Sequence, residues 1–454
     1  MLASMYANHV PATARLGRAV ADDERMRAIF SLLRNNPNAD ALLTGGSARD
    51  AIIGRIPKNT HILVRGVTPQ ALTAHFNKNG DQFTAHGQGL IKVQTTGGSL
   101  NVELPQVETR KSAIAHHTAS LQQDLARRDF TANALAYSLK DGILHDPWKG
   151  LEDIHAKKLK TIGAPKERFA KDPLRTLRLI RLASELGFTI DTKTWNAASQ
   201  AVPRLSATHQ NDLGETEFQI PRAKVGAEIS RAITANPRYA FSMLSKSGVF
   251  AETINLNNAA EEATEKQLAH LADQDFLRLH RLKSASPSMV FAALFTHLDD
   301  AGEKFARKAM AGLHLHQAHE HGAHGFSHLV VAKLLKDLRS LHNLPSHGNH
   351  EITHLLASDH ADELLALAHA HSLAHPTNST FKERLHALRR HKEELQLVNP
   401  VKLMRGRDLI ALKIPPGPHV RTLLKRIRSA QLTGDISDKD EALSFARSLY
   451  NALA

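Results

Sequence analysis

The stretch LLTGGSARDAIIGRIPKNTHILVRG, residues 42–66, decides how the N-terminal part of this chain folds. A short apolar run ends at Gly45 and Gly46, where a helix begins, and HILVRGV (61–67) has the composition of a second strand. A strand, a glycine turn and a helix start together present free backbone N–H groups to a phosphate. One Gly-Gly pair is weak evidence alone, because most such pairs mark simple turns. The stretch therefore predicts a phosphate cradle that needs support from other motifs.

Composition limits the class of protein. The chain has 454 residues, 42% hydrophobic and 23% charged, which suits a soluble protein of two to four domains. It has no cysteine, which excludes disulfides, thiolate nucleophiles and Cys-ligated zinc and fits a reducing compartment. No apolar run reaches about 18 residues, so we expect no membrane span and a cytoplasmic protein.

The charge balance points to a partner. The chain carries 58 Lys and Arg against 45 Asp and Glu, a net charge of +13. Such a surplus attracts polyanions. No helix combines a concentrated basic face with a bulky aromatic face, so nucleic acid is favoured over a membrane surface.

Strand signals are confined to the first part of the chain. LIKVQTT (90–96) and SLNVELPQV (99–107) are further strand candidates, so the first 145 residues are predicted to be mixed α/β. From about Gly150 onward, apolar residues recur at spacings of three and four, which predicts helices.

Three motifs in this order resemble one family. They are GGSARDAIIGRIPK (45–58), DLARRDFTANALAY (124–137) and the long segment from DPWKGLEDI to LASELGF (146–188). They are similar to the opening segment, the Arg-Arg-Asp motif and the neck of the bacterial tRNA nucleotidyltransferase and poly(A) polymerase family, the class II CCA-adding enzymes. Residues 222–250 resemble the body helices of that family, and residues 403–427 resemble its tail.

The resemblance implies a fold and a division into parts. The fold is α+β: a nucleotidyltransferase head of the polymerase-beta type, with a mixed five-stranded sheet, followed by an all-α neck, body and tail that hold tRNA. The expected parts are an N-terminal extension (1–21), the head (22–145), a neck with nucleotide-selecting helices (146–215), a helical body (216–285), a helical region with a candidate degenerate His-Asp module (286–395) and a helical tail (396–454).

Several residues are expected to bind nucleotide. Gly45 and Gly46 let the backbone approach a triphosphate, and Arg49 can pair with its oxygens in a forked geometry. The alternative is a tight turn beside a surface arginine. The resemblance adds Arg127 and Arg128 as sugar and phosphate contacts, with Asp129 orienting them.

The neck motif KDPLRTLR supplies the remaining nucleotide contacts. Asp172, Arg175 and Arg178 fall at spacings of three, which predicts one shared helix face. In the family, such an acid and arginine select CTP or ATP, so both nucleotides are expected ligands. The alternative is an ordinary salt bridge within a helix.

The metal-binding acids of the family are replaced. The family uses two Mg²⁺ ions held by Asp-x-Asp after Gly-Arg-x-x-Lys, and this chain has Asn59, Thr60 and His61 there. A third acid position holds Asn101. An amide brings no charge and imidazole suits Mg²⁺ poorly, so no catalytic position is intact and Mg²⁺ binding is doubtful. Glu103 shares the strand face of Asn101 and is a candidate stand-in ligand.

Two further departures accompany these substitutions. The loop expected to be glycine-rich is AIAHHTAS (113–120), without glycine, and the acid usual before the Arg-Arg motif is Gln123.

Histidines gather in HLHQAHEHGAHGFSHL (314–329) and HALRRH (386–391). FAALFTHLDDAGE (291–303) resembles a degenerate form of the central segment of a His-Asp phosphohydrolase module. The candidate relics are His297 and either Asp299 or Asp300, and His328 and His360 are candidate later ligands. The adjacent His-Asp pair is absent, solvated histidines are the alternative, and no metal is predicted there.

Three functions remain open. The first is a catalytically impaired member, inactive or weak, that binds tRNA-like RNA and nucleotide. The second is an active CCA-, CC- or A-adding enzyme, or poly(A) polymerase, with an unconventional shell of Glu103, His61 and Asn59 around Mn²⁺. The third is a subunit that partners an active homologue.

Overall fold

The structure of the chain is a computed structural model. It describes residues 11–57, 60–78, 82–86, 90–95, 98–105, 120–254, 286–294, 328–343, 358–374, 402–412, 414–415 and 417–451, and a few single residues between 313 and 388. The chain divides into two compact units, Met1–Leu205 and Ser206–Ala454.

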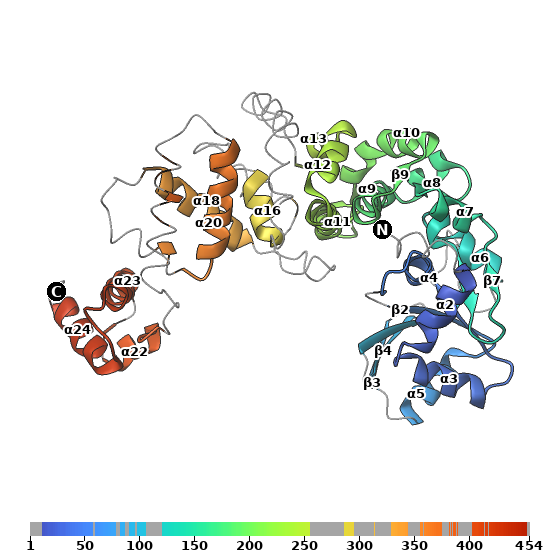
Figure 1. Cartoon of the computed structure of the whole chain (residues 1–454), viewed down its shortest axis with the longest axis horizontal. Coiled ribbons are helices and arrows are strands. Elements are labelled where there is room, and N and C mark those ends of the chain that lie inside the picture. The colour runs from blue at the N-terminus through green and yellow to red at the C-terminus, as the bar shows by residue number, and fades with distance from the viewer. Residues whose placement is uncertain are drawn as a thin grey trace. The chain divides into compact units, whose positions relative to one another are not determined.

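A mixed sheet forms the centre of the first unit (Figure 1). Its strands are β1 (Asp40–Thr44), β2 (Thr60–Arg65), β3 (Gln82–His86), β4 (Leu90–Thr95), β5 (Gly98–Glu103), β6 (Ala136–Ser138) and β7 (Leu144–His145). They lie in the order β3-β4-β5-β2-β1-β6-β7, and only β2 and β5 are parallel neighbours. The predicted α+β class with a mixed sheet is confirmed.

The predicted number of five strands is wrong. Among the described residues the sheet has seven, because the chain turns back after the Arg-Arg motif and places β6 antiparallel beside β1, with Leu42 opposite Ser138. The two-residue β7 then pairs with β6. Both added strands are too short to show an alternating apolar pattern in the sequence.

Helices cover this sheet and continue beyond it. The first unit contains α2 (Ala12–Ala21), α3 (Met26–Asn35), α4 (Gly45–Ile52), α5 (Pro69–Lys78), α6 (Leu121–Ala126), α7 (Gly150–His155), α8 (Pro165–Lys171), α9 (Leu174–Leu186) and α10 (Thr192–Gln200). It also has a 3₁₀ turn at Thr131–Asn133 and a two-residue parallel pair, β8 (Lys158–Leu159) with β9 (Thr189–Ile190). A second 3₁₀ turn, Val202–Ser206, spans the boundary between the two units.

The core of the first unit joins the sheet to α6. Leu42, Leu63 and Leu125 are fully buried in one cluster, and each buried leucine contributes about 2 kcal/mol. The N-terminal helix α2 also belongs to the unit, because Leu16 is fully buried and Arg15 donates to the carbonyl of Ile52 at 2.8 Å.

The described residues of the second unit form helices and one β-hairpin. Its helices are α11 (Arg222–Ala235), α12 (Pro237–Lys246), α13 (Val249–Ile254), α16 (Pro287–Leu294), α18 (His328–Asn343), α20 (Ala361–Ala374), α22 (Gly406–Ala411), α23 (Pro418–Thr433) and α24 (Lys439–Asn451). The last three share a core built around Leu409, Leu423 and Ala446, all fully buried.

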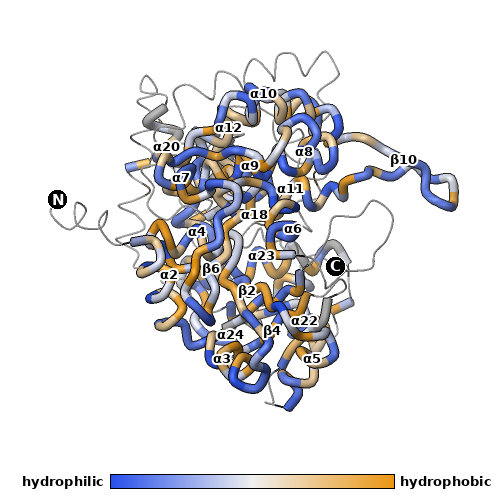
Figure 2. Tube along the Cα trace, turned by 90° about the vertical axis from the view of Figure 1, so that its right-hand side faces the viewer, coloured by the Kyte–Doolittle hydropathy of each residue, from blue (hydrophilic) through white to orange (hydrophobic). Residues whose placement is uncertain are grey.

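The hairpin, β10 (Thr208–Gln210) with β11 (Thr216–Phe218), projects as a mostly hydrophilic arm (Figure 2). Its turn is held by Asn211, whose side-chain oxygen accepts from the backbone N–H groups of Leu213 and Glu215. No helix within the described ranges has the length and apolar character that crossing a membrane requires.

Candidate functional site

The glycine turn joins β1 to α4 and lies beside two arginines. Gly45 has a φ of +65°, which favours glycine because a side chain would strain the backbone there. A Cβ placed on Gly45 would lie 3.5 Å from Nη1 of Arg128, and one on Gly46 would lie 3.3 Å from Nη2 of Arg49. The turn predicted as a phosphate cradle is therefore flanked by two guanidinium groups.

Arg49 is fixed within the head by contacts with Asp50 and Asn133. It is buried, and its Nη2 lies 2.7 Å from Oδ1 of Asp50. Its Nη1 donates to Oδ1 of Asn133 at 2.5 Å, and Asn133 in turn donates to Asp129 at 2.9 Å. Asp129, predicted to orient the Arg-Arg pair, thus hydrogen-bonds Asn133, and its charge also helps to raise the pKa of Arg128.

The substituted metal-ligand positions meet on two neighbouring strands. The parallel register of β2 and β5 places His61 opposite Asn101. The amide nitrogen of Asn101 lies 3.2 Å from Nε2 of His61, and Nδ1 of His61 lies 3.3 Å from Oε1 of Glu103. An imidazole with its proton on Nδ1 satisfies both contacts. Asn59, the other substituted position, lies outside the described residues.

Glu103 is the centre of this polar group. Its Oε2 lies 3.2 Å from Nη2 of Arg128 and 3.6 Å from Nη2 of Arg127. Burial alone raises the pKa of Glu103, but the hydrogen bond from His61 and the positive charges of Arg128 and Arg127 outweigh it and lower the pKa to about 2. Glu103 is therefore ionised throughout the neutral range.

A second carboxylate anchors the same arginines. Asp124 is fully buried in α6 and accepts from Nε of Arg127 at 2.8 Å and from Nη2 of Arg128 at 3.1 Å. Burial lowers the pKa of Arg128, but Glu103 and Asp124 more than compensate and raise it. Asp124 was not predicted, although its spacing of three and four residues from the two arginines is a signal that the sequence contains.

The residues around Glu103 do not fit a pair of magnesium ions. Mg²⁺ prefers carboxylate oxygens, whereas the described positions offer an imidazole and an amide. Glu103, the carboxylate next to the substituted positions, is already paired with two guanidinium groups, whose charge repels a dication. Within the described part of the chain, no group of three or more His, Cys, Asp or Glu could hold a metal ion.

The neck departs from the predicted helix geometry. Asp172 is not on the face of α9 but caps the end of α8, and Pro173 separates the two helices. The prediction of one shared helix face is therefore wrong for Asp172, because proline interrupts the helical run. Arg175 still reaches it, with Nε 3.5 Å from Oδ2 of Asp172, and Arg178 lies half-buried one turn further along α9.

Two neck arginines hold the backbone of the Arg-Arg pair. Arg175 donates to the carbonyl of Arg127 at 3.1 Å, and Arg168 donates to the carbonyl of Arg128. Arg168, one turn before Asp172, was not predicted. The structure thus connects the candidate selecting residues of the neck to the arginines beside the glycine turn.

The structure describes some of the other positions at which the sequence differs from the family pattern. Gln123 forms a capping box with Ser120 at the start of α6, with hydrogen bonds of 2.8 and 3.2 Å, so an amide serves there as a helix cap. Residues 113–117 of the glycine-free loop lie outside the described residues, as do His297, Asp299, Asp300 and the side chain of His328. His360 directly precedes α20 and contacts Glu363, in the first turn of that helix, at 3.1 Å.

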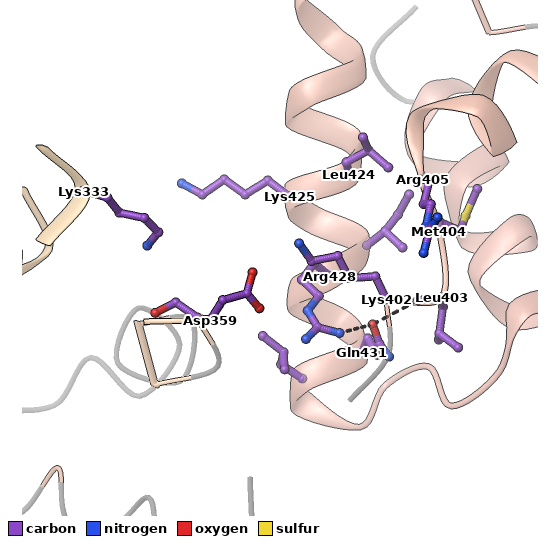
Figure 3. Close-up of a pocket in the computed structure, with 13 residues that line it drawn as sticks. Lys333, Asp359, Lys402, Leu403, Met404, Arg405, Leu424, Lys425, Arg428 and Gln431 are labelled. Atoms are coloured by element: carbon purple, nitrogen blue, oxygen red, sulfur yellow. Dashed lines mark hydrogen bonds between the residues drawn. The ribbon is translucent and has the colours of Figure 1, made fainter. Parts of the chain in front are cut away.

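A cationic cavity of about 390 Å³ lies at the tail helix α23 in the second unit (Figure 3). Apolar side chains form part of its wall, including Leu403, Leu424 and Ile427. The charged lining residues are Lys333, Asp359, Lys402, Arg405, Lys425 and Arg428. In Figure 3 the carboxylate of Asp359 faces Arg428, which donates to Gln431 at 2.6 Å. Five cations against one acid make this cavity attractive to anions.

We expect Glu103→Gln to lower thermal stability at neutral pH and to lose this effect in acid. The pKa of Glu103 is lowered from 4.5 to about 2, so the ionised group stabilises the folded chain fully above 4.5 and progressively less as the pH falls toward 2. The full contribution is of the order of 3 kcal/mol. The difference between the melting temperatures of parent and variant should stay constant above about pH 4.5 and shrink from there down to about pH 3; a constant difference over the whole range contradicts the expectation.

Comparison with known proteins adds independent findings. The family model described as "Poly A polymerase head domain" matches residues 41–160. Poly(A) polymerase I of Escherichia coli O6:H1 is 27% identical over 323 residues, which cover 67% of this chain and 66% of that relative, just under two thirds of its length. The CCA-adding enzyme of Lacticaseibacillus paracasei is 30% identical over 256 residues, 56% of this chain and 60% of that enzyme.

Solved structures share the fold. The Bacillus stearothermophilus CCA-adding enzyme in complex with CTP superposes with a TM-score of 0.64 at 21% identity, covering 94% of this chain and 98% of that one. The Thermotoga maritima CCA-adding enzyme complexed with tRNA gives a TM-score of 0.52 at 18% identity, covering 95% of this chain and 98% of that one.

Proposed function

This chain belongs to the class II tRNA nucleotidyltransferase family of CCA-adding enzymes and poly(A) polymerases, and on that basis we propose that it binds tRNA-like RNA and nucleotide with impaired nucleotidyl transfer. One observation carries the proposal. The positions at which family resemblance requires metal-binding acids hold His61 and Asn101, and the neighbouring Glu103 is paired with Arg127 and Arg128.

The nucleotide part of the proposal rests on the retained arginines. Arg49 and Arg128 flank the glycine turn, where guanidinium groups suit phosphate oxygens in a forked geometry. Arg175 and Arg178 lie on α9 with Asp172 beside them, so a donor and acceptor set for a base is available in the neck. Structures of relatives with CTP and with ATP support this assignment.

The RNA part rests on charge and on the tail. The whole chain has a net charge of +13, and the cavity at α23 gathers four cations from the tail itself: Lys402, Arg405, Lys425 and Arg428. Lysine and arginine neutralise phosphates and release counterions, which is the main source of sequence-independent affinity for RNA. The relative with bound tRNA supports a tRNA-like partner.

A second candidate is an active enzyme with a different metal shell. The contact that favours it is the 3.3 Å approach of His61 to Glu103, which brings two of the three alternative ligands together. Mn²⁺ accepts imidazole more readily than Mg²⁺ does. Glu103 would first have to leave Arg127 and Arg128, so we rank this function second.

Arg175→Ala is expected to weaken ATP and CTP binding at least about tenfold, the equivalent of about 1.4 kcal/mol. The side chain is buried and connects Asp172 to the backbone of Arg127, so its loss releases both the neck acceptor and the arginine pair. Calorimetry on the full chain measures the affinities. Arg27→Ala, at a side chain 80% exposed on α3, is the matched control and should bind like the parent. Equal affinities in all three proteins, with equal melting temperatures, contradict the nucleotide proposal.

A further inference from the structure

We infer that Glu103 is an internal counter-anion that occupies the arginine pair and thereby sets the affinity of the site for phosphorylated ligands. The inference rests on the proposed nucleotide site and assigns a specific residue as its affinity determinant. Glu103 is the last residue of β5, so it reaches the arginines from the sheet, whereas the glycine turn reaches them from the start of α4.

The geometry makes carboxylate and phosphate competitors. Nη2 of Arg128 lies 3.2 Å from Oε2 of Glu103, while Nη1 of the same guanidinium lies near the turn, 3.5 Å from a Cβ placed on Gly45. A phosphate at the turn therefore has to share this group with Glu103. Two anions on one guanidinium repel each other, so each weakens the binding of the other.

The net charge of the groups around the arginine pair also indicates that Glu103 weakens the binding of an anion. Arg127 and Arg128 contribute two positive charges, and Glu103 and Asp124 contribute two negative ones, so the four groups are neutral together. Arg49 is likewise paired with Asp50. A triphosphate therefore meets a site that is already neutralised from within, and removal of the Glu103 charge leaves a net charge of +1 among the four groups.

Glu103 is the carboxylate that a ligand can displace. Asp124 is fully buried in α6 and holds the two arginines, which directly follow the end of that helix, at 2.8 and 3.1 Å. The Glu103 side chain is 16% exposed, its contacts with the arginines are longer at 3.2 and 3.6 Å, and it has His61 as another partner. A ligand can take the arginines from Glu103 while Asp124 continues to position them.

The test compares the affinities of three full-length proteins for pyrophosphate, ATP and CTP by calorimetry with a chelator present. Glu103→Gln keeps the size of the side chain and removes its charge, and should bind all three ligands at least about tenfold more tightly than the parent. Glu24→Gln, at a side chain 62% exposed, removes the same charge from the surface of the same unit and should match the parent.

A second variant covers a folding failure of Glu103→Gln, which melting temperatures would reveal. Glu103→Asp keeps the charge but withdraws it by one methylene from both guanidinium groups, and should give an intermediate affinity. Parent-like affinity in both Glu103 variants, or an equal gain in Glu24→Gln, overturns the inference and leaves the proposed function intact. Absence of binding in the parent and in both Glu103 variants contradicts the nucleotide proposal itself, and the inference fails with it.

Discussion

The purified chain should incorporate no labelled CTP or ATP into tRNA that lacks its CCA end, with either Mg²⁺ or Mn²⁺. In-line nucleotidyl transfer needs metal ions to activate the 3′ hydroxyl and to neutralise the departing pyrophosphate. His61 and Asn101 bring no negative charge to that place, and Glu103 is engaged by two arginines. Each lost charged ligand costs several kcal/mol, and about 1.4 kcal/mol is a tenfold change in rate, so turnover should fall below the assay background.

Restoring the acids should restore addition. The variant Asn59→Asp, His61→Asp, Asn101→Asp returns a carboxylate to each substituted position, two of which, 61 and 101, lie opposite each other on β2 and β5. The arginines at the glycine turn and in the neck remain. Measurable incorporation is expected with Mg²⁺, and the same triple variant carrying Arg175→Ala is the matched control that should lose it. Robust incorporation by the unaltered chain, abolished by Glu103→Ala or His61→Ala, would instead establish an active enzyme with another metal shell.

Binding of tRNA should weaken about a hundredfold between about 50 and about 200 mM salt, the result for about four phosphate contacts. Lys402→Ala with Lys425→Ala removes two of the cations at the tail cavity and should lower the salt slope by about two. Fluorescence anisotropy with labelled tRNA measures both quantities.

The matched control for the salt dependence replaces Lys246 and Lys336, two exposed lysines that do not line the cavity, and should keep a slope nearer that of the parent. Affinity for tRNA no greater than that for an acidic control polymer contradicts the RNA proposal.

Local sequence patterns were sufficient to predict much of this architecture. The glycine turn, the strands that follow it and the helical remainder each have a signal that lies within a few residues. The antiparallel β6 and β7 were missed because pairs of two and three residues have no pattern of their own, and their place depends on β1. Asp172 was misplaced because the spacing of three suggested one helix, although Pro173 marks its interruption.

The site depended more on contacts between distant segments. Substitution of the metal-binding acids could be read directly from Asn59, His61 and Asn101. What replaced them could not, because the contact of Glu103 with Arg128 joins residues 25 positions apart, and that of His61 with Glu103 joins residues 42 apart. The parallel register of β2 and β5 brings these side chains together, and sequence periodicity does not encode which strands become neighbours.

Two hydrogen bonds couple the neck to the backbone of the Arg-Arg segment. Arg168 donates to the carbonyl of Arg128, and Arg175 donates to the carbonyl of Arg127. Because every residue type has a backbone carbonyl, this coupling does not depend on the side chains at positions 127 and 128. Its donors come from α8 and α9, on opposite sides of the Pro173 interruption. A change in the angle between α8 and α9 would therefore rotate the Arg127–Arg128 segment, which lies beside the glycine turn.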